Sequence, residues 1–237
     1  MNPEIIYNGV SSEDMDLIIT KLPEFHRAAR RVTQTDIPGR SQPVVQDEGG
    51  YDAYQTTIEL NANGASIHDI YNWLSGEGWL ISSDEEDYMA YVYIHSQIED
   101  ERFRVDDECY DNLRVQLLVE PYLREVHEKA VTMTAGGTFR GKGHAAALPE
   151  ITVTGTGNIT LMVNGASVLI DGLSGAITID SEAGIAYTGA GDSMAWAGEQ
   201  VTLLDGWPEL KSAGQANLVS WSGSVTSVVI RPNWRYL

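Results

Sequence analysis

The side chains with the clearest potential for chemistry are the adjacent carboxylates of Asp84, Glu85, Glu86 and Asp87. Carboxylates can bind Ca²⁺, but a calcium-binding loop alternates its oxygen ligands and has a glycine in the middle. This run has neither feature. It is more typical of the solvated tip of a hairpin, and we predict no metal site here.

Histidine and cysteine offer no second metal site. The histidines are His26, His68, His95, His127 and His144. No two of them are three or four residues apart, and the chain has a single cysteine, so the usual zinc-ligand spacing is missing. That residue, Cys109, follows Asp106, Asp107 and Glu108, which disfavour its thiolate form. We therefore expect no metal, no cofactor and no nucleophilic thiol.

The segment Gly141–His144 combines two glycines with Lys142 and superficially suggests phosphate binding. It lacks the spacing of a P-loop, and strands rather than a helix are expected after it. We interpret it as a flexible interdomain segment. No Gly-x-Ser-x-Gly nucleophile elbow occurs, and nothing favours a glycosidase pair of carboxylates. The sequence therefore predicts no catalytic residues, and an enzyme acting on polysaccharide is only a third hypothesis.

Three tryptophans of the second half, Trp196, Trp207 and Trp221, could form a platform on which sugar rings stack. Core packing or an interface explains these side chains about as well. They support an alternative hypothesis, a carbohydrate-binding module that recognises host surface glycans.

The charge of the chain is large and uneven. The net charge is -19, and residues 1–130 hold 10 basic and 26 acidic side chains, which gives -16 for that part. Such a surface disfavours electrostatic binding to nucleic acid or to an anionic membrane. No run of eighteen apolar residues occurs, so we predict no membrane-spanning segment.

The secondary structure predicted from the sequence changes near residue 130. Before it, the alternating run 54–60 predicts a strand, and apolar residues at helical spacing predict one main helix over about 66–76, capped by Ser66. After it, short strands are separated by glycine turns, with hairpins predicted at Asn164-Gly165 and Asp171-Gly172. This pattern predicts a mainly β protein whose second half is an antiparallel sandwich or jelly roll.

The order of several motifs resembles the distal tail proteins of siphovirus-type phages and their prophages. They are Ile5–Gly9, Ile37-Pro38-Gly39-Arg40, the helix ending in Trp-Leu and two glycines at Ile70–Leu80, Pro149–Ile151 with Gly155–Ile159, Asn164-Gly165, Ile177–Asp180, Trp207–Leu210 and Ile230–Arg235. The resemblance covers nearly the whole chain, and it is the order and spacing of the motifs that carry it.

The resemblance implies an N-terminal β domain bearing a helix, residues 1–130, that assembles into a ring, and a C-terminal galectin-like β-sandwich, residues 131–222. Residues 223–237 would then form a strand or arm that returns to the first domain. It further implies a virion structural protein made in the host cytoplasm. Its hexameric ring would join the tail tube protein to the tail-tip or baseplate proteins at the distal end of the tail. DNA would pass through the channel without specific binding, and no membrane is involved.

Overall fold

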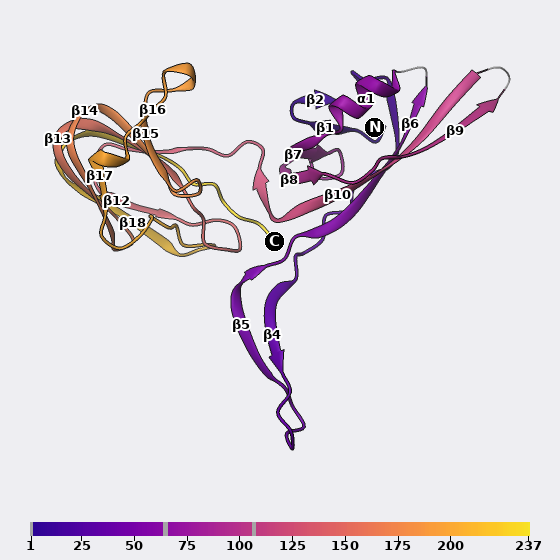
Figure 1. Ribbon diagram of the computed structural model, residues 1–237. Coiled ribbons are helices and arrows are strands. Elements are labelled where there is room, and N and C mark those ends of the chain that lie inside the picture. Colours follow the sequence, from indigo (N-terminus) through magenta and orange to yellow (C-terminus); the bar gives the residue numbers. More distant parts are fainter. Residues whose placement is uncertain (1, 64–65, 106–107) are drawn as a thin grey trace. The chain divides into compact units, whose positions relative to one another are not determined.

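The computed structural model describes residues 2–63, 66–105 and 108–237 (Figure 1). The chain forms two compact units: residues 1–126 together with Leu237 make the first, and His127–Tyr236 make the second. Each unit has its own antiparallel sheet and its own hydrophobic core. The fold is β-rich, as predicted. The side chain of Cys109 lies outside the described residues.

The first unit is built on a sheet with the strand order β2-β1-β7-β8-β10-β6-β3, in which β9 also pairs with β10. Its strands are β1 (Ile5–Tyr7), β2 (Val10–Ser11), β3 (Leu17–Lys21), β6 (Tyr54–Asn63), β7 (Gly76–Ser82), β8 (Tyr88–Ile94), β9 (Glu99–Val105) and β10 (Glu108–Glu125). A separate ribbon consists of β4 (Arg30–Thr35) and β5 (Val44–Tyr51). β10 is long enough to pair with β6 and β9 near its start and with β8 near its end.

The core of the first unit forms where the alternating pattern of β6 meets that of β10. Leu60 lies opposite Leu113, and Ile58 lies opposite Val115. All four side chains are fully buried. Successive residues of a strand point to opposite faces, so the polar residues between them are left on the other face of the sheet.

The predicted helix is α1 (Ile67–Trp73), which is shorter than the expected span of 66–76. It ends early because Gly76 already begins β7. The expected cap is wrong in one respect, since the Ser66 side chain makes no hydrogen bond to the first turn. The apolar face is confirmed, because Ile70 and Leu74 are buried in the core of the first unit.

The second unit has the strand order β11-β18-β13-β14-β15-β16, with β12 also paired to β18 and β17 to β14. Its elements are β11 (Val131–Met133), β12 (Gly137–Arg140), β13 (Glu150–Val163), β14 (Ala166–Asp180), β15 (Ile185–Thr188), η1 (Gly191–Ser193), β16 (Ala195–Trp196), η2 (Gly198–Gln200), β17 (Val201–Leu203) and β18 (Ala216–Arg231). The long strands β14 and β18 each pair with one neighbour near one end and another near the other end. The sheet is therefore curled, which is consistent with a β-sandwich.

The hairpin predicted at Asn164-Gly165 is confirmed. Both residues have positive φ, 53° and 100°, and they join β13 to β14, as a type I′ turn requires. The hairpin predicted at Asp171-Gly172 is wrong, since both residues lie inside β14. Gly172 has a φ of 62°, and its N–H donates to Asn158 Oδ1 at 2.9 Å, opposite a register shift in β13. The glycine thus accommodates an irregularity in the ladder and not a chain reversal.

Residues 223–237 were expected to return to the first domain; residues 223–236 belong to the second unit, and Leu237 is grouped with the first. Up to Arg231 these residues are the second half of β18, which pairs with β13 and with β11. The following segment is fastened within the second unit by Glu128, whose two carboxylate oxygens accept the N–H groups of Asn233 and Trp234 at 2.9 and 2.7 Å. Trp234 is buried in the second core.

Candidate functional site

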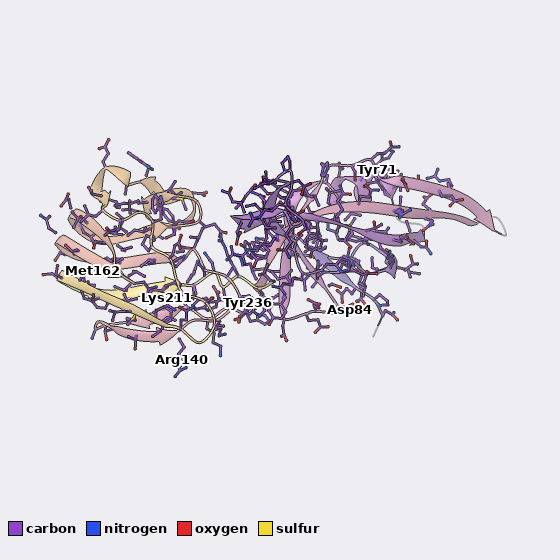
Figure 2. All side chains as sticks on the ribbon, turned by 90° about the horizontal axis from the view of Figure 1, so that it is seen from below. Tyr71, Asp84, Arg140, Met162, Lys211 and Tyr236 are labelled. Atoms are coloured by element: carbon purple, nitrogen blue, oxygen red, sulfur yellow. The ribbon has the colours of Figure 1, made fainter. Side chains whose placement is uncertain are left out.

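The residues first considered for chemistry are scattered over exposed parts of the chain. Asp84–Asp87 lies in the exposed loop between β7 and β8, and Figure 2 labels Asp84 there. All five histidines are exposed. Within the described ranges, no three side chains of His, Cys, Asp and Glu lie close enough together to hold a metal ion.

None of the helices in the described part of the chain is long and apolar enough to cross a membrane.

The segment Gly141–His144 was interpreted as flexible, and this is wrong. Its glycines are held against the backbone of the second unit: a Cβ on Gly141 would lie 2.0 Å from the carbonyl oxygen of Lys211, and one on Gly143 would lie 2.5 Å from that of Arg235. The N–H of His144 donates to Arg235 O at 2.7 Å. Glycine is needed here for close approach of backbones and not for phosphate binding.

A first surface feature is the ribbon of β4 and β5, which we call the arm (residues 30–51). It extends away from the sheet of the first unit (Figure 1). Arg30–Asp47 and Arg31–Asp52 ion pairs lie near its base, and Tyr51 contacts Tyr122 edge to face with ring centroids 5.8 Å apart.

The arm exposes apolar side chains to solvent. They are Val32, Ile37, Val44 and Val45, which are between 40 % and 56 % exposed. No arm residue belongs to the core of the first unit. A two-stranded hairpin is at best marginally stable alone, and its two edges leave backbone groups unpaired. The arm is therefore suited to packing against another chain.

Sequence reasoning found only the tip of the arm. The motif Ile37-Pro38-Gly39-Arg40 forms the turn beyond β4, with Gly39 at a φ of 84° and the Arg40 N–H donating to Ile37 O at 3.0 Å. A Pro-Gly turn between two valine-containing segments was the available signal for a hairpin. Nothing in the pattern indicated that the hairpin would leave the core.

A second feature is an aromatic row on β7 and β8, made by Trp79, Tyr91 and Tyr93. Ring centroids are 5.1 Å apart for Trp79 and Tyr91 and 5.4 Å apart for the two tyrosines, all in edge-to-face contact. Tyr93 Oη donates to Glu120 Oε1 at 2.8 Å. That hydrogen bond, assisted by desolvation, raises the pKa of Tyr93 to about 12. Trp79 and Tyr91 lie directly opposite each other in the β7–β8 ladder.

A third feature is a hollow of about 670 Å³ in the second unit, which we call the Trp207 hollow. Apolar side chains such as Leu148, Val163 and Leu210 line part of it. The polar lining includes Ser181, Asp205, Glu209 and Lys211; Figure 2 labels Lys211.

The three tryptophans do not form the platform considered above. Of the three, only Trp207 lines the hollow. Trp221 pairs with Leu161 in the β13–β18 ladder and packs against the second core. Trp196 is 68 % exposed and lies against Gly198, where a Cβ would come within 2.4 Å of the indole ring.

Comparison with solved structures finds the same fold in phage proteins. The chain matches the Dit (gp 19.1) protein of phage SPP1, described as a paradigm of the hub adsorption apparatus of phages that infect Gram-positive hosts. The TM-score is 0.75 at 13 % identity, over 100 % of both chains. Chains of the phage P2 baseplate in its activated conformation match with TM-scores of 0.53 with Ca (8 % identity, 98 % of both chains) and 0.57 with Sr (9 % identity, 97 % of both chains).

No family model and no curated protein matches the sequence. At these identities, what the chain shares with the phage proteins is the fold. The fold is therefore that of phage tail hub and baseplate proteins, which confirms the architecture implied by the sequence resemblance.

Proposed function

We propose that this protein is a structural component of a phage virion. Six copies of it, the number that the family resemblance implies, form a ring at the distal end of the tail. The ring joins the tail tube protein to the tail-tip or baseplate proteins and leaves a channel for DNA. The protein has no catalytic role in this proposal, and it is made in the host cytoplasm before assembly.

The observation that carries the proposal is the match over the full length of both chains to a protein described as part of a hub adsorption apparatus. The match includes both units, so the chain has the complete two-unit architecture of that protein and not only a common β-sandwich.

The arm supplies a means of self-association. Val32 lies opposite Asp47, and Val45 lies opposite Gln34, so both valines are on the same face of the ribbon. Arm residues outside the core of one subunit can be buried against the next subunit, which makes a head-to-tail contact. A contact of this type closes into a ring when the rotation between subunits divides a full turn.

The charge of the chain suits a conduit for DNA. Residues 1–130 carry a net charge of -16. A lining that holds phosphate through lysine and arginine would slow the passage of DNA, whereas an acidic lining repels it. The ring proposal therefore places part of this acidic surface toward the channel.

Light scattering of the purified chain across a concentration series tests the ring. We expect a species near six times 26.0 kDa. A first variant replaces residues 34–45 by Asn-Gly, because Thr33 and Gln46 are directly paired and a two-residue turn can join them. A second variant, Val32→Lys with Val45→Lys, keeps the ribbon and changes its apolar face. Both variants are expected to shift the protein toward monomer.

The matched control is Ile18→Lys with Leu218→Lys, which changes two apolar side chains of similar exposure outside the arm. This control should assemble like the unmodified chain. A strict monomer at every concentration, or assembly that survives shortening of the arm, would contradict this mode of self-association.

A further inference from the structure

The Trp207 hollow has no part in the ring proposal. We propose that it is a binding site for one neutral pyranose unit of a saccharide. Its volume of about 670 Å³ lies in the range typical of pockets for small ligands, ~300–1,000 Å³. It combines apolar walls, one aromatic side chain and a few polar groups, as such pockets do.

Trp207 supplies the aromatic wall. The indole is half-buried in the second core and lies against Gly184, where a Cβ would be 3.8 Å from the ring. Gly184 has a φ of 67°, a backbone conformation that favours glycine. Within the described residues, the indole N–H of Trp207 donates no hydrogen bond to the protein. The ring can therefore pack against the C–H face of a sugar and donate its N–H to a hydroxyl.

The polar rim matches hydroxyl groups, which both donate and accept hydrogen bonds. Asp205 and Glu209 supply carboxylate acceptors, and Lys211 supplies an ammonium donor. One oxygen of Asp205 already accepts the N–H of Ser167 at 3.2 Å, which fixes the carboxylate and leaves its other oxygen for a ligand. With two negative groups and one positive group, the rim disfavours an anion and favours a neutral sugar.

Ser181 gives an independent indication of a missing partner. This pocket-lining residue is 5 % exposed, and its Oγ makes no hydrogen bond within the described part of the chain. A buried hydroxyl without a partner is costly, and such groups in native proteins usually mark a bound water or ligand. A sugar hydroxyl, directly or through one water, would satisfy it.

The loop that carries Trp207 is held in place before any ligand arrives. Asn164 Nδ2 donates to the carbonyl oxygen of Glu209 at 2.8 Å, and Asn217 Oδ1 accepts the N–H of Lys211 at 2.7 Å. Leu210 exchanges both backbone hydrogen bonds with Ala147, at 2.8 and 2.9 Å. A fixed loop loses little conformational entropy on binding, which is what a preformed site requires.

The test is a titration of the full chain with methyl α-D-glucopyranoside, methyl β-D-galactopyranoside and the methyl glycoside of N-acetylglucosamine, followed by tryptophan fluorescence and ligand-observed NMR. Glucose 6-phosphate is the anionic probe. We expect saturable binding of at least one neutral glycoside and weaker binding of the phosphate. Trp207→Ala should weaken binding about tenfold or more, because it removes the stacking surface.

Trp196→Ala is the matched control, since Trp196 is an exposed indole of the same unit that does not line the hollow. It should leave the affinity unchanged. Glu209→Gln alters an exposed rim residue without loss of packing, so it tests the site even if Trp207→Ala fails to fold. Absence of saturable binding, or equal losses for Trp207→Ala and Trp196→Ala, would overturn the proposal. The oligomeric state is measured on the same samples, so a failure of the ring is distinguished from a failure of the sugar site.

Discussion

Asn217 shows how single buried polar residues organise the second unit. It is fully buried, and its side chain is satisfied on both sides: Oδ1 accepts from Asn164 Nδ2 at 2.8 Å and from Lys211 N at 2.7 Å, and Nδ2 donates to Lys211 O at 3.2 Å. The same amide thus connects the β13–β14 hairpin to the loop that carries Trp207. A single residue therefore links the turn geometry of Asn164 to the shape of the hollow.

Asn217→Ala should lower the free energy of unfolding by about 2–3 kcal/mol, because it leaves buried backbone and amide groups without partners. Urea unfolding measures this. Asn158→Ala is the control, since Asn158 is exposed and accepts one hydrogen bond from Gly172 N; its loss should be about 1 kcal/mol or less. If both variants lowered the free energy of unfolding equally, the buried hydrogen bonds of Asn217 would contribute no more to stability than the exposed one of Asn158.

Tyr93 makes the stability of the first unit depend on pH in the alkaline range. Its pKa is raised to about 12, chiefly by the hydrogen bond to Glu120, above an ordinary value of 10.0. The folded state therefore favours the neutral phenol. This contribution to stability is fully present below pH 10 and is lost as the pH rises through about 12.

Tyr93→Phe is expected to lower the free energy of unfolding by about 1 kcal/mol at pH 8, because it removes one hydrogen bond. The difference from the unmodified chain should shrink above pH 10. Denaturant unfolding at a series of pH values follows both quantities. A constant gap between Tyr93→Phe and the unmodified chain up to pH 12 would contradict the assignment.

At the scale of elements, the strands and the helix of this protein are stabilised in different ways. β6 and β10 bury matched apolar pairs across the sheet, such as Leu60 with Leu113. Helix α1 is short and has no side-chain cap, so it depends on the burial of Ile70 and Leu74. Short helices are marginal in water, and packing of the apolar face supplies most of their stability. The arm lacks such packing within its own chain.

The dependence of α1 on burial and not on capping predicts different effects for a substitution at its N-cap and a substitution on its buried face. Ser66→Ala should change the free energy of unfolding by less than about 0.5 kcal/mol, because no cap hydrogen bond is lost, whereas a true cap would cost about 1 kcal/mol. Ile70→Ala should cost about 2–5 kcal/mol through the cavity it leaves. Thermal and urea unfolding compare the two. A large loss for Ser66→Ala would show that its hydroxyl does cap the helix in solution.

At the scale of the whole molecule, the chain has two separate cores. The core cluster of the first unit includes no residue beyond Leu123, and that of the second begins at Val131. Glu128, which holds the backbone of Asn233 and Trp234, belongs to the second unit together with its partners. The elements needed to bury each core therefore lie within one continuous stretch of the chain.

A fragment of residues 127–236 should consequently fold alone. We expect a cooperative thermal transition and dispersed amide signals in NMR spectra of this fragment. Glu128→Ala in the same fragment removes two charge-assisted hydrogen bonds and should lower its midpoint by several degrees. A fragment 135–236, which lacks both Glu128 and β11, serves as the destabilised comparison. An unfolded 127–236 fragment would mean that the second unit needs the first.

The sequence by itself determined the features that depend on local pattern. Alternation of apolar residues placed the strands, helical spacing placed the apolar face of α1, and Asn164-Gly165 specified a hairpin because both residues tolerate positive φ. The order of motifs also indicated the fold that structural comparison then confirmed. The strand, helix and turn signals can be read from the sequence because each one depends on neighbours a few residues away.

Only the tertiary structure decided what depends on distant pairing. Asp171-Gly172 has the composition of a turn, yet the ladder with β13 carries the chain through it as a strand. The composition of Gly141–His144 suggests a flexible segment. In the structure, Gly141 lies against the backbone of Lys211 and Gly143 against that of Arg235, some seventy and ninety residues further along the chain. Trp207 lines the hollow because long-range hydrogen bonds from Asn164 and Asn217 hold the loop that carries it.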